Sequence, residues 1–297
     1  MTDDRAASRT AAPARGLFPR ARRWQAAFGT LRADLAGGLL FLALAAFSWI
    51  GPLLYPHDPL AIHAHHILAA PQARFPLGTD DLGRNVLARL MRGGQTTLAI
   101  SFVASAIGLI AGLAYGLVAG LGPGWLDQIL MRLLDALLAI PTLILLIFFA
   151  AIVPLGEASL AVMLGLVAWP GIARLARNEA RAARERDYVR AARQFGAGRL
   201  YVARVHILRA MLPLVIVNAT FLMADMILGL SGLTFLGLGI EPPHASWGGL
   251  LNSGAQLAVI DPWWLIAFPG LAIFLAILAM NMLGQGLLAR LEGEGQA

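Results

Sequence analysis

The stretch that decides the fold runs from Asn178 to Pro213 and reads NEARAARERDYVRAARQFGAGRLYVARVHILRAMLP. Apolar sequence flanks it on both sides, whereas ten arginines lie between Arg174 and Arg209. Only three acids accompany these ten arginines, so the segment carries a net charge of +7. Arginine next to membrane spans favours the cytoplasmic side of a bilayer. The pattern therefore indicates a structured cytoplasmic loop in a membrane protein.

The composition of the whole chain agrees with a membrane protein. Hydrophobic residues make up 58% of its 297 residues and charged residues only 13%, whereas soluble domains carry about 25% charge. A helical span needs roughly 20 apolar residues, and six apolar stretches are long enough if the fourth borrows a turn beyond Arg174 and the fifth includes Asp225. They are 35–57, 93–126, 136–156, 158–173, 210–240 and 262–289. The sequence predicts an all-α, multi-pass membrane protein with six transmembrane helices.

The predicted topology places both termini in the cytoplasm. Residues 1–34 form a basic arm with seven arginines. The apolar stretch that follows the arm is longer than a signal-peptide core of roughly 7 to 15 residues, so it reads as a retained anchor. Six spans then make up a domain over residues 35–291, place its arginine-rich loop (about 174–209) on the cytoplasmic side, and return the tail, residues 292–297, to that side.

Residue types that are missing exclude several kinds of site. The chain has no cysteine, which excludes disulfides and thiolate metal sites, and all 23 basic residues are arginine. Without lysine the chain has no Walker A phosphate loop, so any ATP chemistry belongs to a partner. The pI near 10.8 fits membrane topology and anionic lipid better than nucleic acid, because the charge sits in one loop and one arm.

A row of small residues recurs every four positions in the second stretch. Such a row lies along one helix face and allows another helix to approach closely. It leaves two alternatives open, packing inside the chain or contact with a partner subunit. The row comprises Ala104, Gly108, Gly112, Gly116 and Gly120.

The arginine-rich loop predicts a helix over 179–195, a turn over 196–198 and a second helix over 199–208. It resembles the coupling loop of ABC importer permeases, whose pattern is Glu-Ala-Ala, three residues, Gly, a spacer, then Ile-Leu-Pro. Arg190 replaces the acid and Arg209 the proline, and Pro213 is expected to take over the helix-breaking role. The resemblance implies a docking surface for an ATPase, made of Asp187, Tyr188, Ala191, Ala192, Phe195, Gly196 and Leu200.

Two further segments resemble the peptide and nickel branch of that family. LGTDDLGRNV, residues 77–86, is similar to an external motif after the first span, where Thr79 or Asp80 is expected to cap a short helix and Arg84 to pair with an acid. FLGLG, residues 235–239, precedes Trp247 in what looks like an external re-entrant helix, where a tryptophan suits the membrane interface. The external residues implied are Gly78, Thr79, Asp80, Gly83, Arg84 and Trp247.

The resemblance implies a type I ABC importer permease fold and a C-type subunit of a dipeptide, oligopeptide or nickel importer. Such a subunit lies in the bacterial inner membrane and binds no cofactor. Its expected partners are a paralogous B-type permease subunit, two cytoplasmic ATPases that use ATP and Mg, an external solute-binding protein and the lipid bilayer. Peptide is the first choice of cargo, and nickel, opine, glutathione or another small solute is the alternative.

Few ionisable residues lie in the apolar stretches. Asp225, near the middle of the fifth, is a translocation-path candidate together with Asn218 on the same helix face. A structural hydrogen bond or a misplaced span boundary would also explain Asp225. Arg132 and Asp135 are expected to form a helical i,i+3 pair.

Four histidines at positions 57, 63, 65 and 66 lie in the first external segment. Imidazoles can bind nickel or zinc, but this segment lacks a carboxylate or thiolate at ligand spacing. We therefore expect no metal site, and histidines that face solvent or a binding protein.

Two other function classes stay open. An intramembrane enzyme would use Asp225 with Asp135 as an acid pair, although no nucleophile or metal motif accompanies them. An ion-coupled secondary transporter would carry internal repeats, and none is clear in the sequence.

Overall fold

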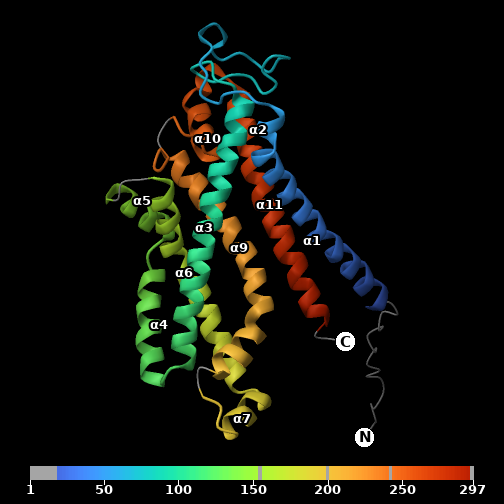
Figure 1. The fold of residues 1–297 in the computed structure, drawn as a ribbon, viewed down its shortest axis with the longest axis vertical. Coiled ribbons are helices and arrows are strands. Elements are labelled where there is room, and N and C mark those ends of the chain that lie inside the picture. Colours follow the sequence, from blue (N-terminus) through green and yellow to red (C-terminus); the bar gives the residue numbers. More distant parts are fainter. Residues whose placement is uncertain (1–18, 153–155, 199–200, 241–242, 295–297) are drawn as a thin grey trace, which may run out of the picture.

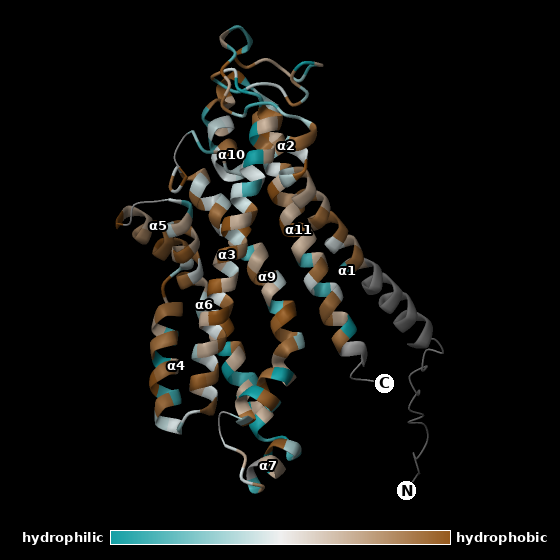
Figure 2. Cartoon of the chain, in the orientation of Figure 1, coloured by the Kyte–Doolittle hydropathy of each residue, from teal (hydrophilic) through white to brown (hydrophobic). Residues whose placement is uncertain are grey.

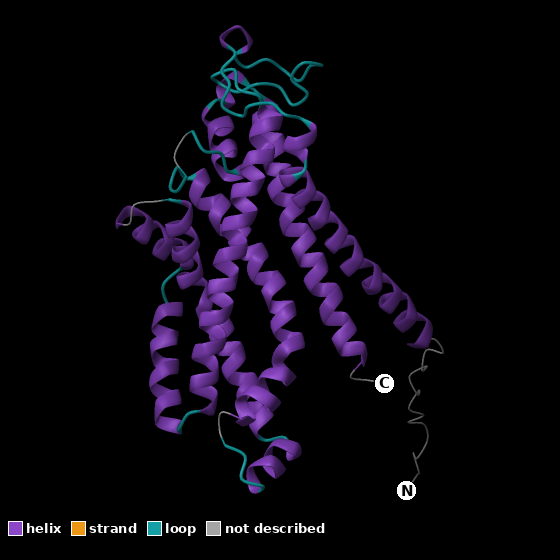
Figure 3. Cartoon of the chain, viewed as in Figure 1, coloured by secondary structure: helices purple, strands orange, loops and turns teal. Residues whose placement is uncertain are grey.

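The computed structural model describes residues 19–152, 156–198, 201–240 and 243–294, and in these ranges the chain is mostly helical (Figure 1). They contain no strand and two isolated β-bridges, Gln72–Phe75 and Thr79–Asn85 (Figure 3). Three expectations lie wholly or partly outside these residues: the first 18 residues of the basic arm, the docking residue Leu200 and the end of the tail.

The helices are α1 (Pro19–Trp49), α2 (Gly51–Leu54), α3 (Val86–Leu121), α4 (Gly124–Leu138), α5 (Thr142–Ile152), α6 (Glu157–Arg184), α7 (Asp187–Gln194), α9 (Leu208–Phe235), α10 (Trp247–Gln256) and α11 (Trp263–Glu294). Short 3-10 turns occur at Ala64–His66 and Ala258–Ile260, and a π-helical turn, Val202–Ile207, leads directly into α9.

Four helices are long and apolar enough to cross a membrane: α3, α6, the continuous helix Val202–Phe235 and Trp263–Leu291. The bent pair α4–α5 makes a fifth if it counts as one span, and Ala33–Trp49 in α1 is a shorter apolar helix. The described residues thus hold apolar segments in the predicted order, compatible with six spans. The fourth, α6, extends well beyond Arg174, as expected.

The third segment differs from the prediction. Instead of one span over 136–156, α4 and α5 meet at an angle of 81°. Pro141 lies at the break, where its ring disfavours helical geometry at the preceding residue and it offers no N–H. The prediction began too late because Asp127, Arg132 and Asp135 interrupt the apolar sequence of α4.

The small-residue row of α3 packs against α6 inside the chain. A Cβ atom built at Gly112 would lie 2.6 Å from Ile172 Cβ, and one at Gly116 would lie 2.6 Å from Ala176 Cβ. Cβ atoms essentially never approach so closely, so these two glycines let the helix backbones touch. Of the two alternatives, internal packing is the one that the structure shows.

A second close helix pair joins the two ends of the chain. A Cβ atom at Gly37 in α1 would lie 2.6 Å from the Ala279 carbonyl oxygen of α11. Asp34 is 5% exposed and its carboxylate pairs with the Arg290 guanidinium. The predicted boundary between the basic arm and the first span, at residue 34, falls inside α1, because this helix already begins at Pro19.

The long helices run roughly along one axis (Figure 1). The loop between α2 and α3 gathers with α10 at one end, which we call the loop end. At the other end lies α7, and the start of α1 and the end of α11 point toward that α7 end. Hydrophobic residues dominate the helices between the two ends, whereas hydrophilic residues concentrate in the loop and around α7 (Figure 2).

Candidate functional site

The connection between α6 and α9 forms a short helix that is anchored on one face. Val189 in α7 is fully buried, in a cluster with Ala180 and Ala183 of α6 and Val202 and Ile207 of the π-helical turn. Leucines of α3 pack against the same cluster. The other face of α7 is largely exposed, and its Tyr188, whose ring contacts His206, is 45% exposed. The helix is thus fixed to α6 and to the start of α9 while it presents polar and aromatic side chains outward.

The end of α7 is a glycine cap. Gly196 has φ +88°, a left-handed conformation that L side chains rarely adopt. The N–H of Ala197 donates to the Ala192 carbonyl oxygen at 3.0 Å, which is the long hydrogen bond of a Schellman motif. Phe195, immediately before the glycine, is 92% exposed. The cap therefore presents an aromatic side chain at the tip of the molecule.

The other predicted docking residues divide between the two faces. Asp187 and Gly196 are exposed, whereas Ala191 and Ala192 are half-buried. No atom of the described chain lies within 4 Å of a Cβ built at Gly196. A glycine is therefore needed at position 196 for its left-handed backbone conformation, and the surface around it is not covered by other described residues.

Three details of the predicted helix–turn–helix are wrong. The first helix is interrupted at Glu185 and Arg186, because α6 continues to Arg184 and α7 starts afresh at Asp187. Residues 201–208 do not form a separate helix, because they continue into α9. Pro213 does not break the chain but lies inside α9. A proline loses one hydrogen bond in a helix, a cost that packing against neighbouring helices can offset.

Some arginines of this region are paired with α4. Arg177 donates to the two Asp127 carboxylate oxygens at 2.7 and 2.6 Å, and Arg181 lies 2.8 Å from the same carboxylate. Arg174 pairs with Asp135 at 2.5 Å. The expected pair of Arg132 with Asp135 is therefore wrong, because the facing helix α6 offers Asp135 a guanidinium.

Asp225 lines a cavity of ≈ 260 Å³ between α4, α5, α6 and α9, together with Pro170, Gly171 and Met226. No hydrogen bond or ion pair to its carboxylate occurs among the described residues, and the side chain is exposed in the single chain. Asn218 donates to the Leu214 carbonyl oxygen one turn earlier at 2.8 Å, so the amide is engaged within its own helix. The two residues share a face but no partner.

The motif over residues 77–86 fastens the loop to the helices. The Thr79 N–H donates to the Ala69 carbonyl oxygen at 3.0 Å and its hydroxyl accepts from the Ala69 N–H at 2.8 Å. Arg84 donates to the Asp80 carboxylate at 2.7 Å, as expected. Trp264 of α11 donates its indole N–H to the Thr79 carbonyl oxygen at 3.1 Å. These contacts hold the loop between α2 and α3 against α11.

Neither Thr79 nor Asp80 caps a helix, contrary to expectation. Asn85 does so, since its side chain accepts from the N–H groups of Leu87 and Ala88. The helix that it caps is not a separate short one but α3, the second span itself.

Two glycines of the motif are required by backbone geometry. Gly78 and Gly83 have φ +78° and +74°, and a Cβ atom at Gly78 would lie 2.9 Å from the Trp264 indole. Both positions allow the loop to fold tightly against its neighbours.

Trp247 is fully buried, so its expected place at the membrane interface is wrong. Its indole N–H donates to the Leu90 carbonyl oxygen at 2.9 Å, and its backbone N–H donates to the Thr97 hydroxyl at 3.1 Å. This tryptophan therefore joins α10 to α3.

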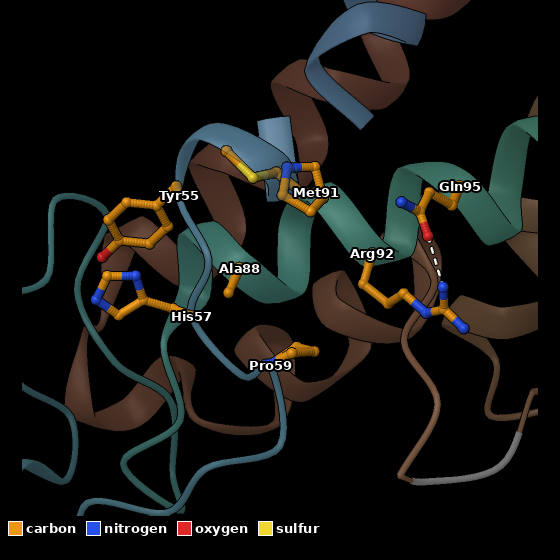
Figure 4. Close-up of a pocket in the computed structure, with 8 residues that line it drawn as sticks. Tyr55, His57, Pro59, Ala88, Met91, Arg92 and Gln95 are labelled. Atoms are coloured by element: carbon orange, nitrogen blue, oxygen red, sulfur yellow. Dashed lines mark hydrogen bonds between the residues drawn. The ribbon is translucent and has the colours of Figure 1, made fainter. Parts of the chain in front are cut away.

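Three histidines of the loop make ring contacts. His57 stacks on Tyr55, with ring centroids 3.8 Å apart, beside a cavity of ≈ 290 Å³ that Arg92 and Gln95 also line (Figure 4). His63 and His66 both contact Phe75. Among the described residues no group of three or more His, Cys, Asp or Glu side chains is arranged to hold a metal ion.

Comparisons with known proteins agree with this architecture. Residues 108–293 match the family described as binding-protein-dependent transport system inner membrane component. The chain is 38% identical over 258 residues to the di/tripeptide transport system permease protein DppC of Pseudomonas aeruginosa, covering 84% of this chain and 85% of that protein. It is 34% identical over 254 residues to the nickel transport system permease protein NikC of Escherichia coli, covering 86% and 90%.

A solved structure shows the same fold. It is an inward-facing conformation of the MetNI methionine ABC transporter, with a TM-score of 0.55 and 22% identity over 68% of this chain and 95% of that chain. The helical architecture is thus an ABC transporter permease fold. Together with the family match over most of the helices, these observations show that the chain is a multi-pass membrane protein that belongs to the family of binding-protein-dependent transport system inner membrane components.

Proposed function

We propose that the chain is one of two channel-forming subunits of an ATP-driven importer, and that the exposed face of α7 docks onto an ATPase subunit. The observation that carries this proposal is the difference in exposure between the two faces of α7. Val189 is fully buried against α6 and the start of α9, while Phe195 is 92% exposed at its tip. A helix that is anchored on one side and exposes an aromatic residue on the other suits a contact that must transmit force.

In this proposal the α7 end faces the cytoplasm and the loop end faces outward. The excess of arginine around α7 supports this orientation. The partners are a paralogous B-type permease subunit, two cytoplasmic ATPases that use ATP and Mg, and a solute-binding protein at the loop end. The docking surface comprises Asp187, Tyr188, Ala191, Ala192, Phe195 and Gly196, with Leu200 beside them in the sequence.

The chain performs no covalent chemistry in this proposal. An intramembrane acid pair of Asp225 with Asp135 has little support, because Asp135 pairs with Arg174 and does not line the Asp225 cavity. The cavity instead offers one carboxylate at a groove between helices, where we place part of the translocation path.

Peptides are the proposed cargo. Support comes from relatives named as di/tripeptide and D,D-dipeptide permeases at 38% identity. Nickel is the second candidate because NikC is 34% identical. Isolating the solute-binding protein that associates with the complex, and identifying its bound ligand, separates the two.

The absence of cysteine makes the docking proposal directly testable. Phe195→Cys at the α7 end and Val259→Cys, a 99% exposed position between α10 and α11, serve as single-cysteine probes. In the assembled complex a bifunctional thiol reagent should cross-link position 195, and not position 259, to an ATPase subunit. In right-side-out vesicles a membrane-impermeant maleimide should label position 259 and spare position 195. Reversed labelling, or no cross-link from position 195, contradicts the proposal.

A further inference from the structure

A buried guanidinium at the loop end lacks its full set of partners. Arg89, in the first turn of α3, is 5% exposed. Its Nε and Nη1 atoms are buried and have no hydrogen-bond partner among the described residues. A buried charge is costly to desolvate, and buried polar groups in native proteins are nearly always hydrogen-bonded. Arg89 is therefore placed to receive an acceptor from outside the described chain.

The carboxylate nearest to the Arg89 guanidinium, that of Asp80, already accepts hydrogen bonds from other groups. Asp80 accepts from the N–H groups of Leu82 and Arg84 at 3.0 and 2.8 Å and from Arg84 Nε at 2.7 Å. Arg89 Nε lies 3.4 Å from Asp80 Oδ2, an ion pair without hydrogen-bond geometry. The second acid, Asp81, pairs with Arg84 at 3.6 Å. Arg84 thus takes the hydrogen bonds of Asp80 and leaves Arg89 incompletely neutralised.

Arg89 faces a cavity of ≈ 270 Å³ between α3, the end of α9 and α10. Amide and hydroxyl side chains of α10 line it together with the exposed His244. No described residue that lines the cavity is acidic. The lining polar residues of α10 are Asn252, Ser253 and Gln256.

We propose that this cavity binds the carboxylate of a small peptide-like solute at the loop end of the channel. The unpartnered Nη1 of Arg89 and the neighbouring Nη2 would donate to the two carboxylate oxygens, because these two terminal nitrogens form the planar edge of a guanidinium that matches a carboxylate. The α10 amides and hydroxyls are suited to the peptide groups of the solute. The volume restricts the occupant to a small molecule. This inference rests on the proposed importer function, which it extends to a solute site on the permease itself.

The test compares the binding of two ligands, alanyl-alanine and its C-terminal amide. Saturation-transfer NMR measures the affinity of each for the whole chain in lipid nanodiscs. The free carboxylate should bind about tenfold more tightly, since a charged hydrogen-bonded pair is lost in the amide. Arg89→Gln should abolish this preference. Arg92→Gln is the matched control and should retain it, because Arg92 lines the separate cavity near His57 (Figure 4). Equal affinity for the two ligands, or a preference that survives in Arg89→Gln, overturns the proposal.

A second measurement uses the unsubstituted chain, so it does not depend on the folding of a variant. Backbone hydrogen exchange over the first turns of α3 and over α10 is followed by mass spectrometry. Alanyl-alanine should slow this exchange, and its C-terminal amide should not. Equal protection by both ligands overturns the proposal. So does a loss of binding-protein affinity in Arg89→Gln with unchanged dipeptide binding, because the acceptor would then be a protein carboxylate.

The proposal and the importer function fail in different ways. A wild-type complex without ATP-driven uptake removes the importer function, yet leaves a carboxylate preference at Arg89 measurable in the nanodiscs. A complex that imports peptides but shows no preference removes only the site.

Discussion

The Arg177 guanidinium of α6 binds both oxygens of the Asp127 carboxylate of α4, fifty residues away in the chain, at 2.7 and 2.6 Å. The Asp127 side chain is only 3% exposed, and Arg181 lies 2.8 Å from it. One buried acid thus holds two arginines of α6 and ties the bent α4–α5 pair to the helix that leads to α7.

Asp127→Ala should lower the stability of the chain strongly. The substitution leaves Arg177 and Arg181 without this carboxylate. Because their side chains are 21% and 47% exposed, the loss should lie below the cost of breaking a fully buried pair, which is about 3–5 kcal/mol. Thermal unfolding of the purified chain in detergent measures the effect. Asp135→Ala is the control, since the Asp135–Arg174 pair is 62% and 50% exposed and such pairs contribute about 0–1 kcal/mol. Equal losses in both variants would contradict the structural role of Asp127.

Gly112→Ala should destabilise the contact between α3 and α6. The added methyl group would lie 2.6 Å from Ile172 Cβ, and overpacking of this kind costs about 1–3 kcal/mol. Gly171→Ala is the control on α6, because no atom lies within 4 Å of its Cβ position among the described residues. A shift in unfolding temperature for Gly112→Ala alone is expected. If the two variants unfold at the same temperature, the helices are not packed as described.

Gly196→Ala should loosen the end of α7. An alanine at φ +88° is strained by about 1–3 kcal/mol, so the Schellman hydrogen bond to Ala192 should open more often. Amide hydrogen exchange over residues 187–198 measures this opening. Gly198→Ala is the control, because Gly198 has no positive φ and open space around its Cβ position. Faster exchange in Gly198→Ala than in Gly196→Ala would exclude the cap.

Phe195→Ala should weaken association with the proposed ATPase partner by about tenfold or more without loss of stability. The side chain is 92% exposed, so it contributes little to folding, whereas aromatic anchors dominate many interfaces. Titration of the labelled ATPase onto the chain in nanodiscs gives the affinity. Val259→Ala, at the other end of the molecule, should leave the affinity unchanged. Normal affinity in Phe195→Ala would remove this residue from the docking surface.

Asp225→Ala should reduce uptake in reconstituted vesicles while the complex still assembles. An ionisable group in a span is costly unless it faces water or protein, and Asp225 lines a cavity without a described partner. Asn218→Ala is a useful comparison, because that amide already binds the Leu214 carbonyl oxygen. Transport at wild-type rates in Asp225→Ala would take the residue out of the path.

The sequence predicts those features that depend on local order along the chain. Hydropathy over about 20 residues locates the apolar segments, and a four-residue repeat locates the face of Gly112 and Gly116. The arginine-rich segment correctly places a turn at Gly196. Each of these signals is contained within a single element.

Features that depend on how two elements face each other escape prediction. Asp135 pairs with Arg174 of α6 and not with Arg132, because the packing of α4 beside α6 brings the two side chains together. Trp247 lies inside because Thr97 and Leu90 of α3 accept its N–H groups. No sequence pattern marks Arg89 as a binding residue, since only the structure shows that Arg84 donates to Asp80, the acid nearest to Arg89.

The burial of Val189 has a mechanical consequence. Its neighbours belong to α6 and to the turn that starts α9, and these same two helices supply lining residues of the cavity at Asp225. In the proposed importer, a force applied to α7 should therefore be passed to α6 and α9 and change their separation at this cavity, because packed interiors transmit strain.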